Sequence, residues 1–231
     1  NFGDLVQASI KEKIDIIFSG AGLPLDLPKY LTKGSVTKLV PIVSSGRAAL
    51  IIAKKWWQNY NYIPDAFVVE GPEAGGHLGF SFDDLENKKL DLKTLAKDVL
   101  EVTKDLKTEH NKEIPVIAGG GITTGEQIKE LMDLGISAVQ IGSSLIPTLE
   151  CDASDDFKQS FIRATPDKIR LIKSPVGMPG RAIENDFLLA AERGEKRPKS
   201  CKYYCIKSCN PKTTNYCIAE ALLSAYRGKL N

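Results

Sequence analysis

The chain has 231 residues, 42% of them hydrophobic and 26% charged, which is the composition of a soluble globular protein with a substantial core. Its 31 basic and 29 acidic residues nearly balance, so the sequence argues against a nucleic-acid partner. The longest apolar runs are too short to span a bilayer and no signal peptide opens the chain, so we expect no membrane partner. The odd number of cysteines, five, argues against a secreted disulfide scaffold, so we expect a cytoplasmic location.

Five short runs rich in β-branched residues predict strands. They are nearly continuous in apolar residues, which is typical of parallel strands that are buried on both faces. The runs are IDIIFS, KLVPIVS, DAFVVE, IPVIA and SAVQIG, at residues 14–19, 38–44, 65–70, 114–118 and 137–142.

Helical patterns lie between these runs and alternate with them. Asp91 is placed to cap one helix, and Thr123 with Glu126 forms a capping box for another, which Gly135 ends. Because strands and helices alternate, we expect an α/β fold with a parallel sheet. The predicted helices cover residues 46–60, 91–110 and 124–134.

Glycine and serine follow every predicted strand, which favours a (β/α)8 TIM barrel over an open sheet. An open doubly wound sheet usually concentrates its glycines after one strand, whereas all the strand ends of a barrel line one site. The chain shows only five βα units, assigned to residues 1–150, and residues 151–231 resemble a helical and irregular C-terminal extension. The chain does not begin with Met, and we expect the first three units, on the order of 75–90 residues, to lie upstream.

The strongest candidate site is the run EGPEAGGHLG, residues 70–79, directly after the third strand. Its glycines allow backbone to approach a ligand closely, and barrel enzymes place their chemistry at this end of the strands. His77 can exchange a proton near neutral pH; the alternative is a structural histidine in a glycine-rich turn. Glu70 is placed to accept a hydrogen bond from a ligand ring, whereas Glu73 is equally explained as a solvated loop charge.

Two Gly/Ser turns, one βα unit apart, predict a phosphate site. They are AGGGI at residues 118–122 and QIGSS at residues 140–144. In barrels, the loops after the last two strands often bind phosphate through backbone N–H groups and a helix N-terminus. The alternative is a pair of tight glycine turns that bind nothing.

The runs EGPEAGGHLG, PVIAGGGI and AVQIGSSL together resemble the nitronate monooxygenase family, formerly called 2-nitropropane dioxygenase, which includes flavin-dependent enoyl-acyl-carrier-protein reductases. The resemblance covers most of residues 14–150. It implies a barrel with non-covalent FMN and His77 as the catalytic residue. The family's first-strand glycine loop and third-strand Asn are absent from this sequence. The implied cofactor contacts are Glu70, Gly75, Gly120, Gly121, Gln140, Ile141, Gly142 and Ser143.

The resemblance implies an FMN-dependent oxidoreductase that oxidises alkyl nitronates with O2. One alternative is a flavin-dependent enoyl-acyl-carrier-protein reductase that uses NAD(P)H as co-substrate. An alternative of another class is a non-redox barrel that binds a phosphate ligand. The expected partner is a small molecule, either a nitronate or an enoyl thioester. The sequence leaves open whether the chain forms a homodimer.

The C-terminal region contains two further patterns. SPVGMPGRAI, residues 174–183, resembles a long-tailed branch of the family and predicts a fixed irregular loop over the site. The cysteines of the tail could bind a metal ion or an iron–sulfur cluster. Their spacing, however, is not the C-x2-C of zinc sites, and it would also place small apolar residues on one helix face. We therefore predict no metal site. The tail cysteines are Cys201, Cys205, Cys209 and Cys217; the fifth cysteine is Cys151.

Overall fold

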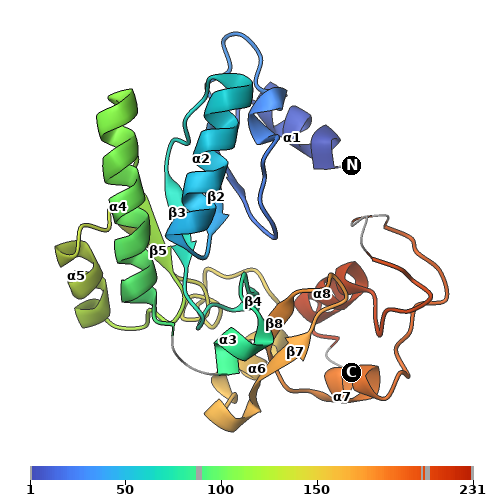
Figure 1. The fold of residues 1–231 in the computed structure, drawn as a ribbon. Coiled ribbons are helices and arrows are strands. Elements are labelled where there is room, and N and C mark those ends of the chain that lie inside the picture. Colours follow the sequence, from blue (N-terminus) through green and yellow to red (C-terminus); the bar gives the residue numbers. More distant parts are fainter. Residues whose placement is uncertain (1, 87–89, 204, 206–208, 230–231) are drawn as a thin grey trace. The chain divides into compact units, whose positions relative to one another are not determined.

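The computed structural model describes residues 2–86, 90–203, 205 and 209–229, and it divides the chain into two compact units (Figure 1). The N-terminal unit comprises Asn1–Ala74 and Gly79–Gln140, and the C-terminal unit comprises Gly75–Leu78 and Ile141–Asn231. The units therefore divide after Gln140, whereas the sequence analysis ended its first segment at residue 150. Each unit is described by itself below.

A parallel sheet forms the centre of the N-terminal unit. Its order, β1-β2-β3-β5-β6, follows the chain without reversal. A doubly wound sheet reverses its order at a switch point, so the described order is that of consecutive barrel units. The α/β class, the parallel sheet and all five predicted strands are confirmed; closure into a barrel is not seen in the described residues. The strands are β1 (Ile16–Ser19), β2 (Lys38–Val43), β3 (Phe67–Glu70), β5 (Val116–Gly119) and β6 (Ala138–Gln140).

Helices α2 (Gly46–Tyr60) and α4 (Leu92–His110) of this unit begin at side-chain caps, of which the sequence analysis predicted Asp91. Ser45 accepts a hydrogen bond from the amide of Ala48, and Asp91 accepts one from the amide of Thr94. These bonds satisfy N–H groups that have no partner within the helix. The described helices are α1 (Phe2–Lys11), the 3-10 turn η1 (Leu27–Tyr30), α2 (Gly46–Tyr60), α3 (Phe82–Glu86), α4 (Leu92–His110) and α5 (Gly125–Asp133).

The predicted capping box of α5 is wrong by one residue. Thr124 and Gln127 form it, instead of Thr123 and Glu126. Gln127 reaches back to accept from the backbone amides that precede the helix, which its amide oxygen does as well as a carboxylate would. Gly135 follows the helix with φ +108°, as expected for a C′ glycine.

The sheet buries apolar side chains on both faces. Helices α2 and α4 lie side by side against one face (Figure 1), where Trp56 and Phe67 are fully buried. The Trp56 indole donates to the Pro24 carbonyl, so its polar atom is satisfied inside the core. On the other face Val40 and Val68 form a second cluster. Burial on both faces explains why the strands have continuous apolar runs.

Asp65 ties together the amino ends of neighbouring strands. Its carboxylate accepts from the amide of Leu39, from the Tyr62 hydroxyl and from Lys112, which lies 3.0 Å away. Burial alone would raise the pKa of Asp65, but these three donors together lower it below its usual value. In barrels this end of the strands supports stability, whereas the carboxyl end carries the site.

The C-terminal unit contains an antiparallel sheet that the sequence analysis did not predict. Its order is β4-β8-β7, and Pro179 to Ile183 of the predicted irregular loop form the central strand. Proline fits because it is the first residue of its strand, and Gly180 fits because a side chain there would meet Ile172 at 3.3 Å. The elements of this unit are β4 (Gly76–His77), α6 (Asp155–Ile162), η2 (Pro166–Lys168), β7 (Ile169–Lys173), β8 (Pro179–Ile183), α7 (Asp186–Glu192) and α8 (Ile218–Tyr226).

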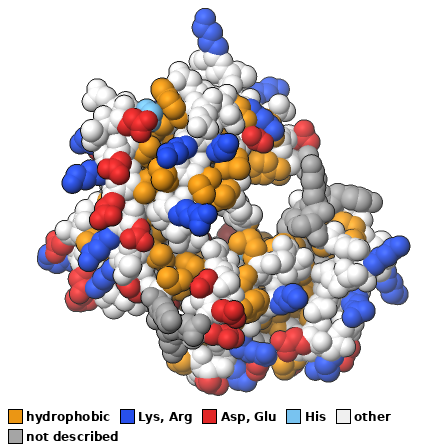
Figure 2. Space-filling view, in the orientation of Figure 1, with side chains coloured by type: hydrophobic (Ala, Val, Ile, Leu, Met, Phe, Trp, Pro, Cys, Tyr) orange, Lys and Arg blue, Asp and Glu red, His pale blue; other side chains and the backbone are white. Residues whose placement is uncertain are grey.

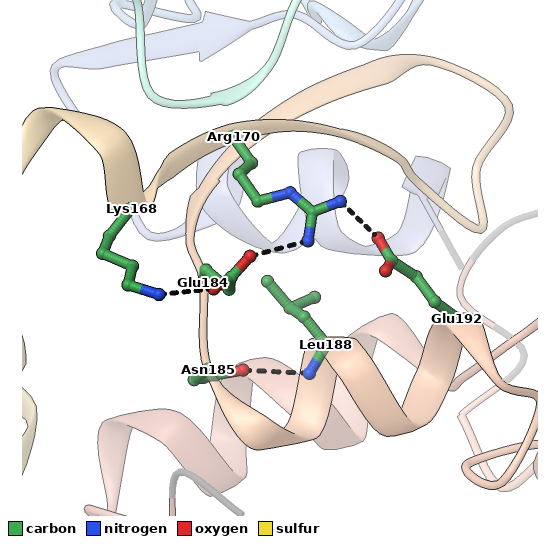
Figure 3. Close-up of polar contacts among 6 residues, drawn as sticks. All are labelled: Lys168, Arg170, Glu184, Asn185, Leu188 and Glu192. Carbon is green, nitrogen blue, oxygen red and sulfur yellow. Dashed lines mark hydrogen bonds and ion pairs between the residues drawn. The ribbon is translucent and has the colours of Figure 1, made fainter.

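Ion pairs connect this hairpin to α7 (Figure 3). Glu184 accepts from both Lys168 and Arg170 at 2.8 Å, and Arg170 also pairs with Glu192 of α7 at 3.1 Å. Asn185 caps α7 directly after Glu184.

On the face shown in Figure 2, basic and acidic side chains are interspersed, in keeping with the near balance of charge in the sequence.

The tail cysteines are free thiols. Burial, followed by the proximity of the other tail thiols, raises the pKa of Cys209, so this thiol stays protonated at neutral pH. In the described part of the chain, no group of three or more His, Cys, Asp or Glu side chains is placed to hold a metal ion. Residues 204 and 206–208, between the cysteines, lie outside that part.

Candidate active site

A row of three residues crosses the carboxyl ends of neighbouring strands in the N-terminal unit. Glu70 of β3 pairs in register with Gly119 of β5, which pairs with Gln140 of β6. The Gln140 side-chain amide donates to the Glu70 carboxylate at 2.9 Å, across the glycine. A Cβ at Gly119 would approach the Gln140 side chain to 3.2 Å, so the glycine leaves room for this bond. Two predicted site residues therefore contact each other directly.

The turn after β5 needs glycine for the backbone itself. Gly120 and Gly121 have φ values of +99° and +73°, which side-chain-bearing residues rarely adopt. A Cβ at Gly120 would lie 2.9 Å from the amide nitrogen of Ala74, and one at Gly121 would collide with Glu73. The loop after β3 thus packs directly on this turn, and Glu73 lies against it rather than being only a solvated charge.

The amides of this turn differ in whether they already have partners. Gln127 accepts from the amides of Thr123 and Thr124, at 2.8 and 3.1 Å, so these two donors are occupied. Among the described residues, no acceptor is recorded for the amides of Gly120 and Gly121. A cavity of about 340 Å³ borders both glycines. Free N–H donors suit an anionic ligand, and the charged residues that line the cavity are the carboxylates Glu73 and Asp91 and the cation Lys93.

The second predicted phosphate turn, apart from its first residue Gln140, lies in the C-terminal unit. Leu145 donates its amide to the Gly142 carbonyl at 2.9 Å, which closes the turn. Gly142 and Ser143 are exposed, and a Cβ at Gly142 would meet nothing within 4 Å. The turn therefore does not require glycine for packing, in contrast to Gly121.

His77 is held by the antiparallel sheet of the C-terminal unit. Gly76 and His77 pair with Arg181 and Gly180 of β8, and the next amide, of Leu78, donates to the Pro179 carbonyl at 2.8 Å. Gly76 has φ +72°, so glycine is required where the chain turns into this short strand.

The imidazole of His77 contacts one buried hydroxyl. Nε2 lies 2.6 Å from Ser174 Oγ, which is contributed by the turn between β7 and β8. Ser174 is 4% exposed, and its backbone amide donates to the Met178 carbonyl at 3.1 Å, so its position is fixed by the turn. Among the described residues no partner is recorded for Nδ1. Ser174 was not singled out from the sequence; its place at the start of SPVGMPGRAI was the available signal.

The half-buried setting of His77 affects its protonation. Burial lowers the pKa of His77 below 6.5, because removing water disfavours the imidazolium cation. The neutral form is then the main form at pH 7, and it can accept a proton.

The predicted site residues are divided between the two units. Those of the N-terminal unit are Glu70, Gly120, Gly121 and Gln140, and those of the C-terminal unit are Gly75, His77, Ile141, Gly142 and Ser143. The structure brings Glu70 and Gln140 into contact and links His77 to Ser174.

The fold and these features define an α/β protein whose polar residues gather at the carboxyl ends of parallel strands, as in barrel enzymes. Its family follows from a direct match: the family model for nitronate monooxygenase covers residues 2–229, so the chain belongs to the nitronate monooxygenase family.

Known proteins of similar sequence carry the same name. A probable nitronate monooxygenase of Staphylococcus saprophyticus is 25% identical over 187 residues, which are 81% of this chain and 49% of that protein. A nitronate monooxygenase of Paraburkholderia phytofirmans is 26% identical over 188 residues, covering 79% and 46%. The chain thus spans about half the length of these relatives.

Solved structures agree on the fold. FabK from Thermotoga maritima has a TM-score of 0.63 at 28% identity, covering 83% of this chain and 53% of that one. Nitroalkane oxidase from Streptomyces ansochromogenes has a TM-score of 0.68 at 22% identity, covering 99% and 58%, and at this identity the match bears on the fold alone. None of the described helices has the length and apolar character needed to cross a membrane.

Proposed function

We propose that this chain is the flavin-binding part of an FMN-dependent oxidoreductase that oxidises alkyl nitronates with O2. The observation that carries the proposal is a histidine favoured in its neutral form and bonded to a buried serine, in a chain of the nitronate monooxygenase family. Small-molecule chemistry at a strand end needs a proton-transferring group of this kind.

The donor set fits FMN in its chemistry. A phosphate needs N–H donors without other partners, and the amides of Gly120 and Gly121 meet this requirement among the described residues. In the proposal, Gly120, Gly121, Gly142 and Ser143 hold the phosphate, and Gln140 and Ile141 adjoin it. Glu70 and Gly75 lie near the ring, where the Glu70 carboxylate can accept from a ring N–H. When bound, FMN supplies the electron transfer, and the protein supplies binding and orientation.

His77 is the proposed catalytic residue. A neutral imidazole can take the α-proton from a nitroalkane, or donate a hydrogen bond to the oxygens of an anionic nitronate. The Ser174 hydroxyl bonds to Nε2 of the imidazole. Nδ1 has no partner among the described residues, so in the proposal it is the ring nitrogen that contacts the substrate. A ring held by one buried hydroxyl loses little freedom when the substrate binds.

The test is the absorption spectrum of the purified full chain after incubation with FMN, followed by oxygen uptake with an alkyl nitronate. The proposal expects a bound flavin spectrum and nitronate-dependent oxygen consumption. A protein that retains no FMN would contradict it and would favour the non-redox barrel that binds a phosphate ligand.

Enoyl-thioester reduction is the second candidate, because the family resembled by the sequence includes such reductases and a neutral His77 can also orient or protonate an enoyl thioester. The two functions differ in electron source. If the protein oxidises NAD(P)H only in the presence of a crotonyl thioester and takes up no oxygen with an alkyl nitronate, it is an enoyl-thioester reductase and the first proposal is wrong.

A further inference from the structure

A separate cavity of about 480 Å³ lies within the C-terminal unit. It is bordered by the start of α7, by residues 196–202 and by α8 with the two residues before it. None of the residues assigned above to catalysis or flavin binding lines it. Its volume is in the range of pockets that bind small molecules.

The cavity is strongly basic. Among the described residues, Glu220 is its one carboxylate, against five cations that have no recorded ion pair or side-chain hydrogen bond. Cations elsewhere in the same unit do pair: Lys168 with Glu184, and Arg193 with Glu195. Like charges around one hollow repel one another, and a bound anion removes this repulsion. The cations are Lys196, Arg197, Lys199, Lys202 and Lys229.

Aromatic rings form another part of the lining. Phe187 and Tyr216 meet edge to face, with ring centroids 5.4 Å apart, and the Lys196 ammonium lies 5.7 Å from the Phe187 centroid. Tyr216 is 5% exposed, and burial raises its pKa, so its hydroxyl stays protonated. The aromatic pair and the alanines of α8 offer a surface for a planar, apolar group beside the cations.

We propose that this cavity binds a small molecule that carries two phosphates and a planar ring, of the nucleoside diphosphate class. Arg197, Lys199, Lys202 and Lys229 match the phosphates, and Phe187, over which the Lys196 ammonium already lies, matches the ring. Glu220 can accept hydrogen bonds from sugar hydroxyls, which gives the single carboxylate a role that a bare anion would not. The site is distinct from the proposed flavin site.

The test is calorimetric titration of the full chain with adenosine diphosphate, with pyrophosphate and adenosine as partial ligands. We expect adenosine diphosphate to bind more tightly than either part, and to bind equally well in the presence of saturating FMN. Binding should weaken as salt is raised, since the contacts are charged. No binding, competition by FMN, or pyrophosphate binding as tightly as the diphosphate would overturn the proposal.

A double variant locates the site. Arg197→Gln with Lys199→Gln should weaken diphosphate binding by about tenfold or more, because two charge-assisted contacts are lost. Lys212→Gln is the matched control: Lys212 is exposed in the same unit but does not line the cavity. Equal binding by the double variant and the control would refute the assignment. His77→Ala should bind the diphosphate normally, which separates this proposal from the proposed function.

Discussion

At the scale of single residues, His77 sets a clear expectation for the pH dependence of turnover. Its pKa lies below 6.5 because of burial, and the neutral form is the proposed base. Activity should therefore be highest where the imidazole is neutral, and it should fall as the pH drops through the lowered pKa. The acid limb of kcat/KM should have its midpoint below 6.5, measured with an alkyl nitronate.

Replacing each of the two histidines tests this assignment. His77→Ala should keep bound flavin and lose about 10²–10⁴-fold in turnover, the usual contribution of a positioned acid–base group. His110, which packs on Trp57 at a centroid distance of 4.5 Å, provides the control His110→Gln. The control should retain turnover and the acid limb; if the limb disappears in the control instead, His77 has a structural role.

In the proposed function Ser174 acts through His77, so its removal should have a smaller effect than the removal of the imidazole. Ser174→Ala removes one hydrogen bond, whose net value of about 0.5–1.5 kcal/mol corresponds to roughly a two- to tenfold loss in kcat/KM. Because burial is the cause of the lowered pKa of His77, the acid limb should keep its midpoint while the plateau falls.

The control for this variant is Ser160→Ala, in the same unit. Ser160 donates to the Phe157 carbonyl within α6, so the variant loses a comparable bond that involves neither His77 nor Ser174. Similar turnover in the two serine variants would show that Ser174 does not position His77.

At the scale of elements, two glycines four residues apart, Gly121 and Gly125, should respond differently to alanine. Gly121 has φ +73° and a Cβ there would lie 2.9 Å from the Glu73 Cβ, so Gly121→Ala should destabilise the protein by about 1–3 kcal/mol. Gly125 begins α5 with nothing within 4 Å, so Gly125→Ala should be neutral or stabilising by up to about 1 kcal/mol. Urea unfolding measures both, and equal effects would contradict the turn geometry.

The elements also show what the sequence could predict. The five parallel strands and the helices between them follow from apolar runs and caps, since each is specified by its own residues. The β7–β8 hairpin was missed because IRLIK and PGRAI have no continuous apolar run, and Pro and Gly indicated a loop. His77 was singled out from its glycine-rich setting and stays a prediction, whereas Ser174 was not singled out, because its contact with His77 joins positions 97 residues apart.

At the scale of the whole molecule, Asp65 should make stability depend on acid. Its folded pKa is below the unfolded value, so its contribution is present above about pH 4 and is lost as the pH falls through the folded pKa. Asp65→Asn should lower the free energy of unfolding at pH 7 by roughly 1–3 kcal/mol, because a buried set of donors loses its charged acceptor. The difference from the unmodified chain should shrink towards about pH 3.

Urea unfolding at both pH values measures this effect, with Asp105→Asn as control. Asp105 is an exposed residue of α4, and its replacement should leave the free energy of unfolding nearly unchanged at either pH. A constant difference between Asp65→Asn and the unmodified chain across this range would show that the carboxylate is not the source of the acid sensitivity.

The pairing of β4 with β8 has a consequence for biosynthesis. On the ribosome His77 emerges after β3 and before β5 of the parallel sheet, but its partners Ser174 and Gly180 are added only about a hundred residues later. A nascent chain can therefore begin to form the hydrophobic core of the N-terminal unit while the imidazole still lacks its hydrogen-bond partner and β4 still lacks its partner strand. In the proposed function turnover depends on these partners, so a product terminated before the hairpin would contain parallel strands and yet lack the proposed activity.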